Sequence, residues 1–328
     1  MLLFAANDPG SQNHIKPIYL RAVADGAEAE IIDLMSAPEF AVDARAIELI
    51  EQRRPSLLVS GSSSNQEEKA LVQACKAKGN STLSVVDFAV GRKLKGREPD
   101  NLSDRFLVTN QFAANELLDL GVDSERVILA GSAHLEQVFL AGFDQPAESI
   151  ISHYGIEPGK AVVSFFCAAN QANSVRAVAS LADNLAGMPI ESARVIIKPH
   201  PRMPDKQKLK EICERVDQFI YDSEGTTSTA SILAASNLSL SIASTVSLES
   251  IILGVPSAFF LIGLDDGTYE DPIPHITSVP RIRDSATFGR FLDEALDRQS
   301  NLGNLDVENF SGSLDRSWAV VQSMLASA

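Results

Sequence analysis

The chain has 328 residues, enough for two domains of ordinary size, each with its own core. With 45% hydrophobic and 22% charged residues, its composition is that of a soluble globular protein. The net charge of −15 excludes broad nucleic-acid binding, which needs a basic surface.

Neither a membrane span nor a secretory context is expected. The longest apolar runs, such as residues 258–262, are far too short to span a bilayer. The first residues, Met1–Ala6, lack a basic segment and fit a buried strand better than a signal peptide. Three widely spaced cysteines show no zinc or redox pattern: Cys75, Cys167 and Cys213. These features predict a cytoplasmic protein with reduced thiols and without a transmembrane segment.

Apolar runs of strand character alternate with helix-spaced segments through the first half of the chain. Strands are predicted at Leu2–Ala6, Ala29–Asp33, Ser56–Ser60, Thr82–Val86, Arg105–Val108 and Arg126–Ala130. Helices are predicted at Asn65–Lys78 and at Gln111–Leu120, the second closed by Gly121.

The same alternation begins again at Ala161. Strands are predicted at Ala161–Phe166, Arg194–Lys198, Gln218–Tyr221, Leu238–Ile242 and Ser257–Ile262. Helices are predicted at Ser174–Ala186, Lys206–Val216 and Val246–Leu253, and then around Thr287–Leu296 and Leu314–Met324. Strict alternation of strands and helices predicts parallel sheets with right-handed crossovers.

The stretch from Ala141 to Lys160, which contains two prolines and two glycines, is the predicted join between the two series. We therefore predict an α/β fold of two Rossmann-like domains facing across a cleft, residues 1–145 and residues 146–328. The final helices are expected to pack back across the join.

Two strand ends in the second half bear side chains capable of chemistry. Val195–Pro201 is an apolar run that ends in a lysine, a histidine and two prolines. Ser241–Glu249 is a strand-like run that ends in small hydroxyl residues and opens a helix. Open α/β sheets bind ligands at such strand ends, and a helix start with hydroxyls and a nearby cation suits phosphate. This pattern predicts a nucleotide monophosphate or diphosphate site.

The same residues resemble the GT-B superfamily, the two-Rossmann glycosyltransferases that also include the UDP-N-acetylglucosamine 2-epimerases. The resemblance rests on Phe106–Asn110, Leu120–Ser132, Leu233–Asn237, Ser244, Thr245, Glu249 and Gly254–Pro256. The Lys198–Pro201 segment is similar to the HP motif of bacterial sialyl- and Kdo-type transferases and of the CDP-glycerol glycerophosphotransferases.

The resemblance implies a glycosyltransferase that moves a sugar from a CMP-, UDP- or CDP-linked donor to a hydroxyl of a glycan, lipid-linked or protein acceptor. Surface polysaccharide or glycoconjugate synthesis is the implied setting, with inversion at the sugar and no metal or cofactor. A 2-epimerase and a glycerophosphotransferase are alternatives on the same fold. A non-catalytic nucleotide-binding or scaffold protein is an alternative of another class, because fold does not imply function.

The second domain is expected to bind the donor. The resemblance implies that His200, held between two prolines, contacts the donor phosphate and stabilises the leaving group, and that Glu249 accepts from the ribose hydroxyls. A rigid turn is the alternative for His200, and a helix-dipole contact is the alternative for Glu249. The hydroxyls at the helix start bind phosphate or merely cap the helix. The predicted donor site comprises Lys198, His200, Arg202, Ser244, Thr245, Ser247 and Glu249.

The first domain is expected to receive the acceptor. Asp8 and His14, in the loop after the first strand, are the candidate general bases, although Asp8 also suits a turn or a helix cap. Gly10, which permits close backbone approach, Ser11, Ser62 and Asp87 are further candidates for lining the cleft. Asp265 and Asp266 suit a turn better than a metal site.

One local run departs from the acidic balance of the chain. Its cations are Arg92, Lys93, Lys95 and Arg97. Such a run can meet an anionic acceptor or a lipid head group in a peripheral membrane contact, but a solvated basic loop is the favoured interpretation.

Overall fold

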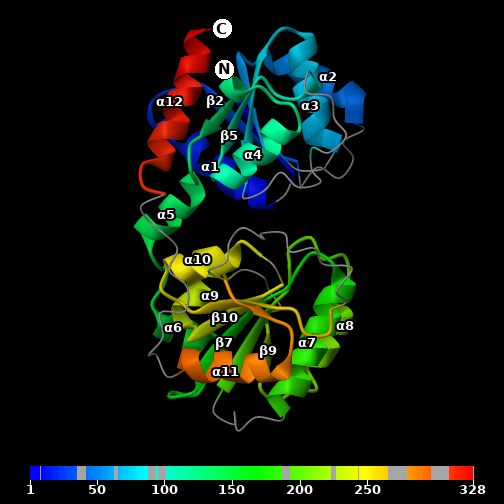
Figure 1. The fold of residues 1–328 in the computed structure, drawn as a ribbon, viewed down its shortest axis with the longest axis vertical. Helices are drawn as coiled ribbons and strands as arrows, with labels where there is room; N and C mark the ends of the chain where they lie inside the picture. Colours follow the sequence, from blue (N-terminus) through cyan, green and yellow to red (C-terminus); the bar gives the residue numbers. More distant parts are fainter. Residues whose placement is uncertain are drawn as a thin grey trace. The chain divides into compact units, whose positions relative to one another are not determined.

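The strands of the chain form two separate sheets, one in each of two compact units (Figure 1). Unit 1 comprises Met1–Gln137 and Val307–Ala328, and unit 2 comprises Val138–Asp306. The computed structural model describes residues 1–7, 9–34, 42–62, 66–87, 94, 101–186, 193–222, 227–242, 244–264, 279–296 and 310–327. The expected boundary between residues 145 and 146 lies inside unit 2, and the C-terminal tail belongs to unit 1.

Unit 1 contains a parallel sheet in the order β2-β1-β3-β4-β5-β6. Its strands are β1 (Leu2–Ala6), β2 (Ala29–Asp33), β3 (Leu57–Ser60), β4 (Ser81–Val86), β5 (Arg105–Val108) and β6 (Val127–Leu129). Its helices are α1 (Pro9–Ala24), α2 (Val42–Arg53), α3 (Gln66–Ala77), α4 (Gln111–Asp119) and α12 (Ser313–Ala326), while α5 (Ala133–Ala141) spans the unit boundary.

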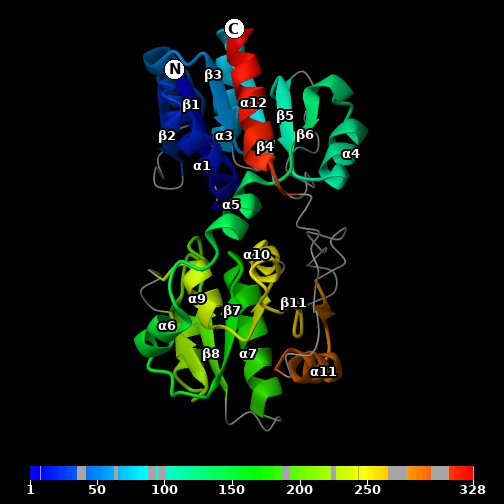
Figure 2. The same cartoon turned by 90° about the vertical axis from the view of Figure 1, so that its left-hand side faces the viewer.

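Alternate residues of β1 supply two cores, because successive side chains of a strand point to opposite faces. Leu2 and Phe4 pack with α1 and α12, whereas Leu3 and Ala5 pack with α2 and α3. Both views show α12 beside α1 (Figures 1 and 2). Trp318 of α12 is buried there, and its indole Nε1–H donates to the Oδ2 of Asp25 at 2.7 Å.

Unit 2 contains a second parallel sheet in the order β12-β11-β10-β7-β8-β9. Its strands are β7 (Ala161–Phe166), β8 (Ala193–Lys198), β9 (Phe219–Tyr221), β10 (Leu238–Ser241), β11 (Ser257–Phe260) and β12 (Arg281–Ile282). Its helices are α6 (Ala147–His153), α7 (Gln171–Ala186), α8 (Gln207–Cys213), α9 (Thr229–Ala235), α10 (Val246–Ile252) and α11 (Ser285–Leu296). The sequence did not predict β12, which is only two residues long.

Each sheet has one point where the strand order reverses direction. Unit 1 follows the order 2-1-3-4-5-6, so its switch point lies between β1 and β3. Unit 2, counted from β7 as its first strand, follows the order 3-2-1-4-5-6, with its switch point between β7 and β10. Ligands of open α/β sheets bind outside the carboxyl ends of the strands at these points. The predicted α/β fold of two Rossmann-like units is confirmed.

Candidate functional site

The turn after β8 holds His200 in one orientation. The backbone N–H of Met203 donates to the carbonyl of His200 at 3.0 Å, which closes the turn. The backbone N–H of Arg202 donates to the Nδ1 of His200 at 3.1 Å. Because Nδ1 accepts, the neutral imidazole has its hydrogen on Nε2. The half-buried His200 therefore has its N–H at Nε2, and the neighbouring Arg202 is exposed.

Lys198, the last residue of β8, lies in a nearly buried ion pair. Its Nζ is 2.8 Å from the Oδ2 of Asp222 and 2.7 Å from the carbonyl oxygen of Thr227. The side chain of Asp222 is 2% exposed and that of Lys198 is 13% exposed. The carboxylate balances the ammonium charge, so Lys198 adds little net positive charge beside His200. Lys198, which the sequence predicts in the donor site, thus already has an anionic partner.

The hydroxyl groups after β10 divide between the core and the site. The Oγ atoms of Ser241 and Ser247 are 2.9 Å apart, and Ser247 is fully buried. Ser244 is half-buried, and its Oγ accepts the backbone N–H of Val246 at 3.3 Å, a capping contact at the start of α10. Thr245 is half-buried, and its side chain makes no capping hydrogen bond. Glu249 lies within α10 and is 7% exposed.

The loop after β7 also reaches the switch point of unit 2, and it is not among the segments predicted to bind the donor. The backbone N–H of Cys167 donates to the carbonyl of Lys198 at 3.0 Å, which ties the ends of β7 and β8 together. The Oδ1 of Asn170 accepts the N–H of Asn173 at 3.0 Å and caps α7. A strand followed by small residues and an asparagine was the available signal. Burial raises the pKa of the Cys167 thiol, so this residue is not a reactive thiolate.

The predicted acceptor-side residues of unit 1 lie mostly on a helix. Asp8 falls outside the described residues, and α1 begins at Pro9. The first turns of α1 therefore contain Gly10, Ser11 and His14. The sequence predicts a loop at this position, so that part of the prediction is wrong.

His14 is 3% exposed, and its surroundings are those of a packed helix. Its Nδ1 lies 3.5 Å from the Oγ of Ser132, and its ring packs edge-on against His134. Asp87 follows β4 directly, and its backbone carbonyl accepts from the Thr109 hydroxyl at 2.7 Å.

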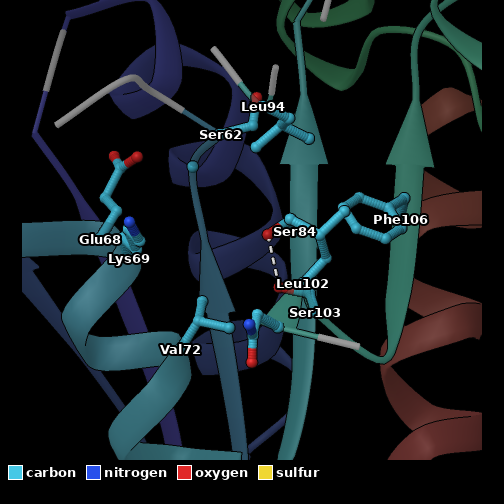
Figure 3. Close-up of a pocket in the computed structure, with 11 residues that line it drawn as sticks. Ser62, Glu68, Lys69, Val72, Ser84, Leu94, Leu102, Ser103 and Phe106 are labelled. Carbon is cyan, nitrogen blue, oxygen red and sulfur yellow. Dashed lines mark hydrogen bonds between the residues drawn. The ribbon is translucent and has the colours of Figure 1, made fainter. Parts of the chain in front are cut away.

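A close backbone approach in this region occurs at Gly61. A Cβ at Gly61 would lie 2.5 Å from the Cβ of Ser11 and 2.7 Å from the Oε1 of Glu68. Ser62 and Glu68 also line a small cavity beside α3 and β4 (Figure 3). Glu68 was not predicted from the sequence, because a glutamate in the first turn of a helix is common.

Two other predictions fall outside the described residues: the basic run Arg92, Lys93, Lys95 and Arg97, and the pair Asp265 and Asp266. Within the described residues, no three His, Cys, Asp or Glu side chains are grouped so that they could hold a metal ion. No helix in the same part of the chain is long and apolar enough to cross a membrane.

No protein-family model and no curated protein matches the chain. Solved structures are similar to it at low sequence identity. The UDP-GlcNAc 2-epimerase of Neisseria meningitidis bound to UDP-GlcNAc is 12% identical, with a TM-score of 0.74 and 99% of each chain covered. The wall teichoic acid polymerase TagF is 13% identical, with a TM-score of 0.64 over 100% of this chain and 89% of TagF. A glycosyltransferase from Rickettsia africae is 12% identical, with a TM-score of 0.65 over 100% of this chain and 99% of the glycosyltransferase.

The chain has the GT-B fold. The predicted GT-B fold is confirmed. The similar structures include epimerases, a polymerase and a glycosyltransferase, so the fold alone does not select one GT-B activity.

Proposed function

We propose that the chain is a GT-B enzyme that binds a nucleotide-linked sugar on unit 2 and transfers the sugar to an acceptor hydroxyl. The main support is the arrangement of donors at the switch point of unit 2. The Nε2–H of His200 follows β8, and the half-buried hydroxyls of Ser244 and Thr245 follow β10. These strands flank β7 on either side. Hydrogen-bond donors gathered at one strand edge suit a phosphate group.

Each residue has a role in this proposal. His200, Arg202, Ser244 and Thr245 hold the donor phosphates without a metal ion, and the buried Glu249 accepts from the ribose hydroxyls. Ser247 acts indirectly, because its hydroxyl is bonded to Ser241 inside the unit. Lys198 braces the end of β8 through Asp222 and does not act as a phosphate ligand.

During sugar transfer, these hydrogen-bond donors stabilise the transition state. The acceptor oxygen forms a bond to the anomeric carbon as the bond from that carbon to the phosphate oxygen breaks. Negative charge develops on the departing nucleotide, where His200 and Arg202 stabilise it. The acceptor hydroxyl must give up its proton, which requires a base. One displacement of this kind inverts the anomeric centre.

A 2-epimerase is the second candidate. The observation that favours it is the buried carboxylate of Glu68 in unit 1, because epimerisation needs acid–base groups. Incubation of the donor alone separates the two. An epimerase converts the nucleotide sugar without an acceptor, whereas a transferase forms product only when an acceptor is present.

A thermal-shift panel of UDP-, CMP-, GDP- and CDP-linked sugars tests donor binding. A donor at a hundredfold excess over its Kd should stabilise the chain by about 2.7 kcal/mol. A chain that binds nucleotide but changes no donor, with or without acceptors, would support a binding protein instead.

Two substitutions test His200 itself. Asn at this position keeps an acceptor for the Arg202 N–H but removes the Nε2–H, whereas Gln places an amide N–H near that position. His200→Asn should weaken donor binding and slow transfer by about 10²–10³-fold with little change in stability. His200→Gln should retain more activity than His200→Asn. Parental turnover in both variants would show that His200 only shapes the turn.

A further inference from the structure

The helix that follows β7 begins at the switch point of unit 2 with backbone donors left over. β7 lies between β8 and β10 in the sheet, and α7 follows it after a short loop. The Oδ1 of Asn170 accepts the N–H of Asn173 at 3.0 Å, and its carbonyl accepts the N–H of Ser174 at 3.1 Å. The N–H groups of Gln171 and Ala172 have no acceptor within the helix. Such N–H groups, at the positive end of the helix dipole, favour an anion.

The side chain of Asn173 adds another donor at the same place. The residue is 5% exposed, and its Oδ1 accepts from a guanidinium nitrogen of Arg176 at 2.6 Å. Because an amide has a single oxygen, this bond fixes the way the amide is turned and leaves its Nδ2 hydrogens for another acceptor. Among the residues that the structure describes, none accepts from this Nδ2. A buried amide N–H without an acceptor costs free energy, so this side chain indicates that a ligand completes its bonding.

The packing of α7 shows which way Asn173 faces. Residues seven positions apart lie on one face of a helix, so Asn173 shares its face with Ser180. Gly263, in the loop after β11, lies against that face and has no room for a Cβ because of the Ser180 Oγ. β11 is the neighbour of β10 in the sheet. Asn173 therefore lies at the start of α7 on the side that faces β10 and β11.

The end of β8 is tied to the opposite side of the same loop. The N–H of Cys167, between β7 and α7, donates to the carbonyl of Lys198 at 3.0 Å, two residues before His200. The start of α7 thus lies between the two sets of donors already proposed for phosphate, one after β8 and one after β10. Neighbouring strands are about 4.8 Å apart, so the ends of β8 and β10 are about 10 Å apart. A diphosphate spans this distance, whereas a single phosphate contacts donors on one side of β7.

We infer that the donor is a nucleoside diphosphate sugar and that the start of α7 binds its second, sugar-bearing phosphate; this inference rests on the proposed transferase function. The α7 donor group comprises the N–H groups of Gln171 and Ala172 and the Nδ2 of Asn173. The sugar-bearing phosphate accepts from this group on one side and from His200 on the other.

The place of the ribose sets the order of the two phosphates. Glu249, the proposed ribose contact, follows Thr245 by one turn of α10. A ribose at Glu249 therefore brings the first phosphate to Ser244 and Thr245, and the second extends over the end of β7. When the sugar is transferred, the bond between the anomeric carbon and the oxygen of the second phosphate breaks, and the electron pair stays on that oxygen. The α7 donor group then meets the developing negative charge.

A carboxylate near this helix start leaves the α7 donor group available. The exposed Asp205 accepts from the side chain of Gln171 at 3.3 Å and from the N–H of Gln207 at 2.9 Å. It therefore contacts the Gln171 side chain, and the N–H of Gln171 is still available to a ligand. Water and salt screen an exposed charge of this kind.

The central test is Asn173→Asp in the full-length protein. Aspartate keeps an oxygen that accepts from Arg176 and nearly the same volume, but it replaces the Nδ2 donor with a second, charged acceptor. Calorimetric titration compares UDP, CDP, GDP, ADP and dTDP, each with its monophosphate. The parent should bind one diphosphate at least about tenfold more tightly than its monophosphate. Asn173→Asp should weaken that diphosphate by about 10–100-fold and change the affinity for the monophosphate by less than about threefold.

Asn115→Asp is the matched control, because it makes the same chemical change and adds the same charge at an exposed position of α4 in unit 1. It should leave both affinities within about twofold. Parental diphosphate affinity in Asn173→Asp, or an equal loss for monophosphate and diphosphate, would overturn the inference and leave the transferase proposal intact. Equal affinities of the parent for each diphosphate and its monophosphate would do the same. A parent that binds none of the ten nucleotides would overturn both.

Gln171→Pro keeps the inference testable if Asn173→Asp fails to fold. Proline is tolerated at the first position of a helix and removes only the backbone N–H, so the Tm should stay at the parental value. Gln171→Ala is its control, since alanine removes the same side chain and keeps the N–H. Gln171→Pro should bind the diphosphate about fivefold or more weakly than Gln171→Ala, with equal affinities for the monophosphate. Equal diphosphate affinities of the two variants would contradict the inference.

Discussion

At the scale of single residues, the ion pair of Lys198 and Asp222 changes how the HP motif is understood. The ammonium lies between a carboxylate and the Thr227 carbonyl, and both charged side chains are largely withdrawn from water. Breaking such a pair leaves an uncompensated buried charge, whereas replacing both partners is far less costly. We therefore expect the lysine of this motif to act mainly on stability and on the position of the following turn.

Lys198→Met should destabilise the protein by about 3–5 kcal/mol, because Asp222 is then left buried without its counter-charge. The double variant Lys198→Met/Asp222→Asn should recover much of that loss. Urea unfolding of the two single variants and the double variant gives the coupling energy between the residues. A cost below about 1 kcal/mol for Lys198→Met would contradict the assignment, since that is the range of an exposed pair.

At the scale of elements, side chains of α1 and α3 lie close to the backbone at the end of β3. Gly61 follows β3 directly, and Ser11 lies in the first turns of α1. A Cβ added at Gly61 would lie 2.5 Å from the Cβ of Ser11, so the site has no space for it. Since Ser11 is on a helix backbone that packs on the sheet, it moves only if α1 moves.

Gly61→Ala should destabilise the protein by about 1–3 kcal/mol through overpacking. Adding Ser11→Gly removes the opposing Cβ, so the double variant should be more stable than the sum of the two single changes predicts. Thermal or urea unfolding measures these differences. Additive effects would show that the two residues do not oppose each other.

At the scale of the whole molecule, the division into units separates the proposed donor site from the C-terminal tail. His200, Ser244, Thr245 and Glu249 all belong to Val138–Asp306. The tail returns to unit 1, where Trp318 and Val321 of α12 are buried with β1 and α1. A fragment that runs from Val138 to Ala328 lacks β1 and α1 and therefore exposes the apolar face of α12.

The fragment Val138–Asp306 should fold and retain donor affinity within a few-fold of the full chain, because it holds a complete sheet and every proposed donor contact. The fragment Met1–Gln137 should unfold at lower temperature than the same fragment joined to Val307–Ala328, since α12 covers its core. Calorimetry and donor titration check both statements. Donor binding by unit 1 alone would contradict the site assignment.

Local patterns determined much of this protein from the sequence. Apolar runs bounded by turn residues placed most of the strands, and their alternation with helices determined the parallel sheets. The HP turn was also predictable, because two prolines restrict the backbone on both sides of His200.

Contacts between distant residues were decided by the tertiary structure. Lys198 pairs with Asp222 because β8 and β9 are neighbours, and Glu68 meets Asn7, 61 residues away, because β1 and β3 are neighbours. The hydroxyl of Ser247 meets that of Ser241 because β10 and the start of α10 pack together. Periodicity and caps depend on residues a few positions apart, so they are written in the sequence. Which strands lie side by side, and hence which side chains meet at a switch point, depends on burying all the apolar faces of each unit at once.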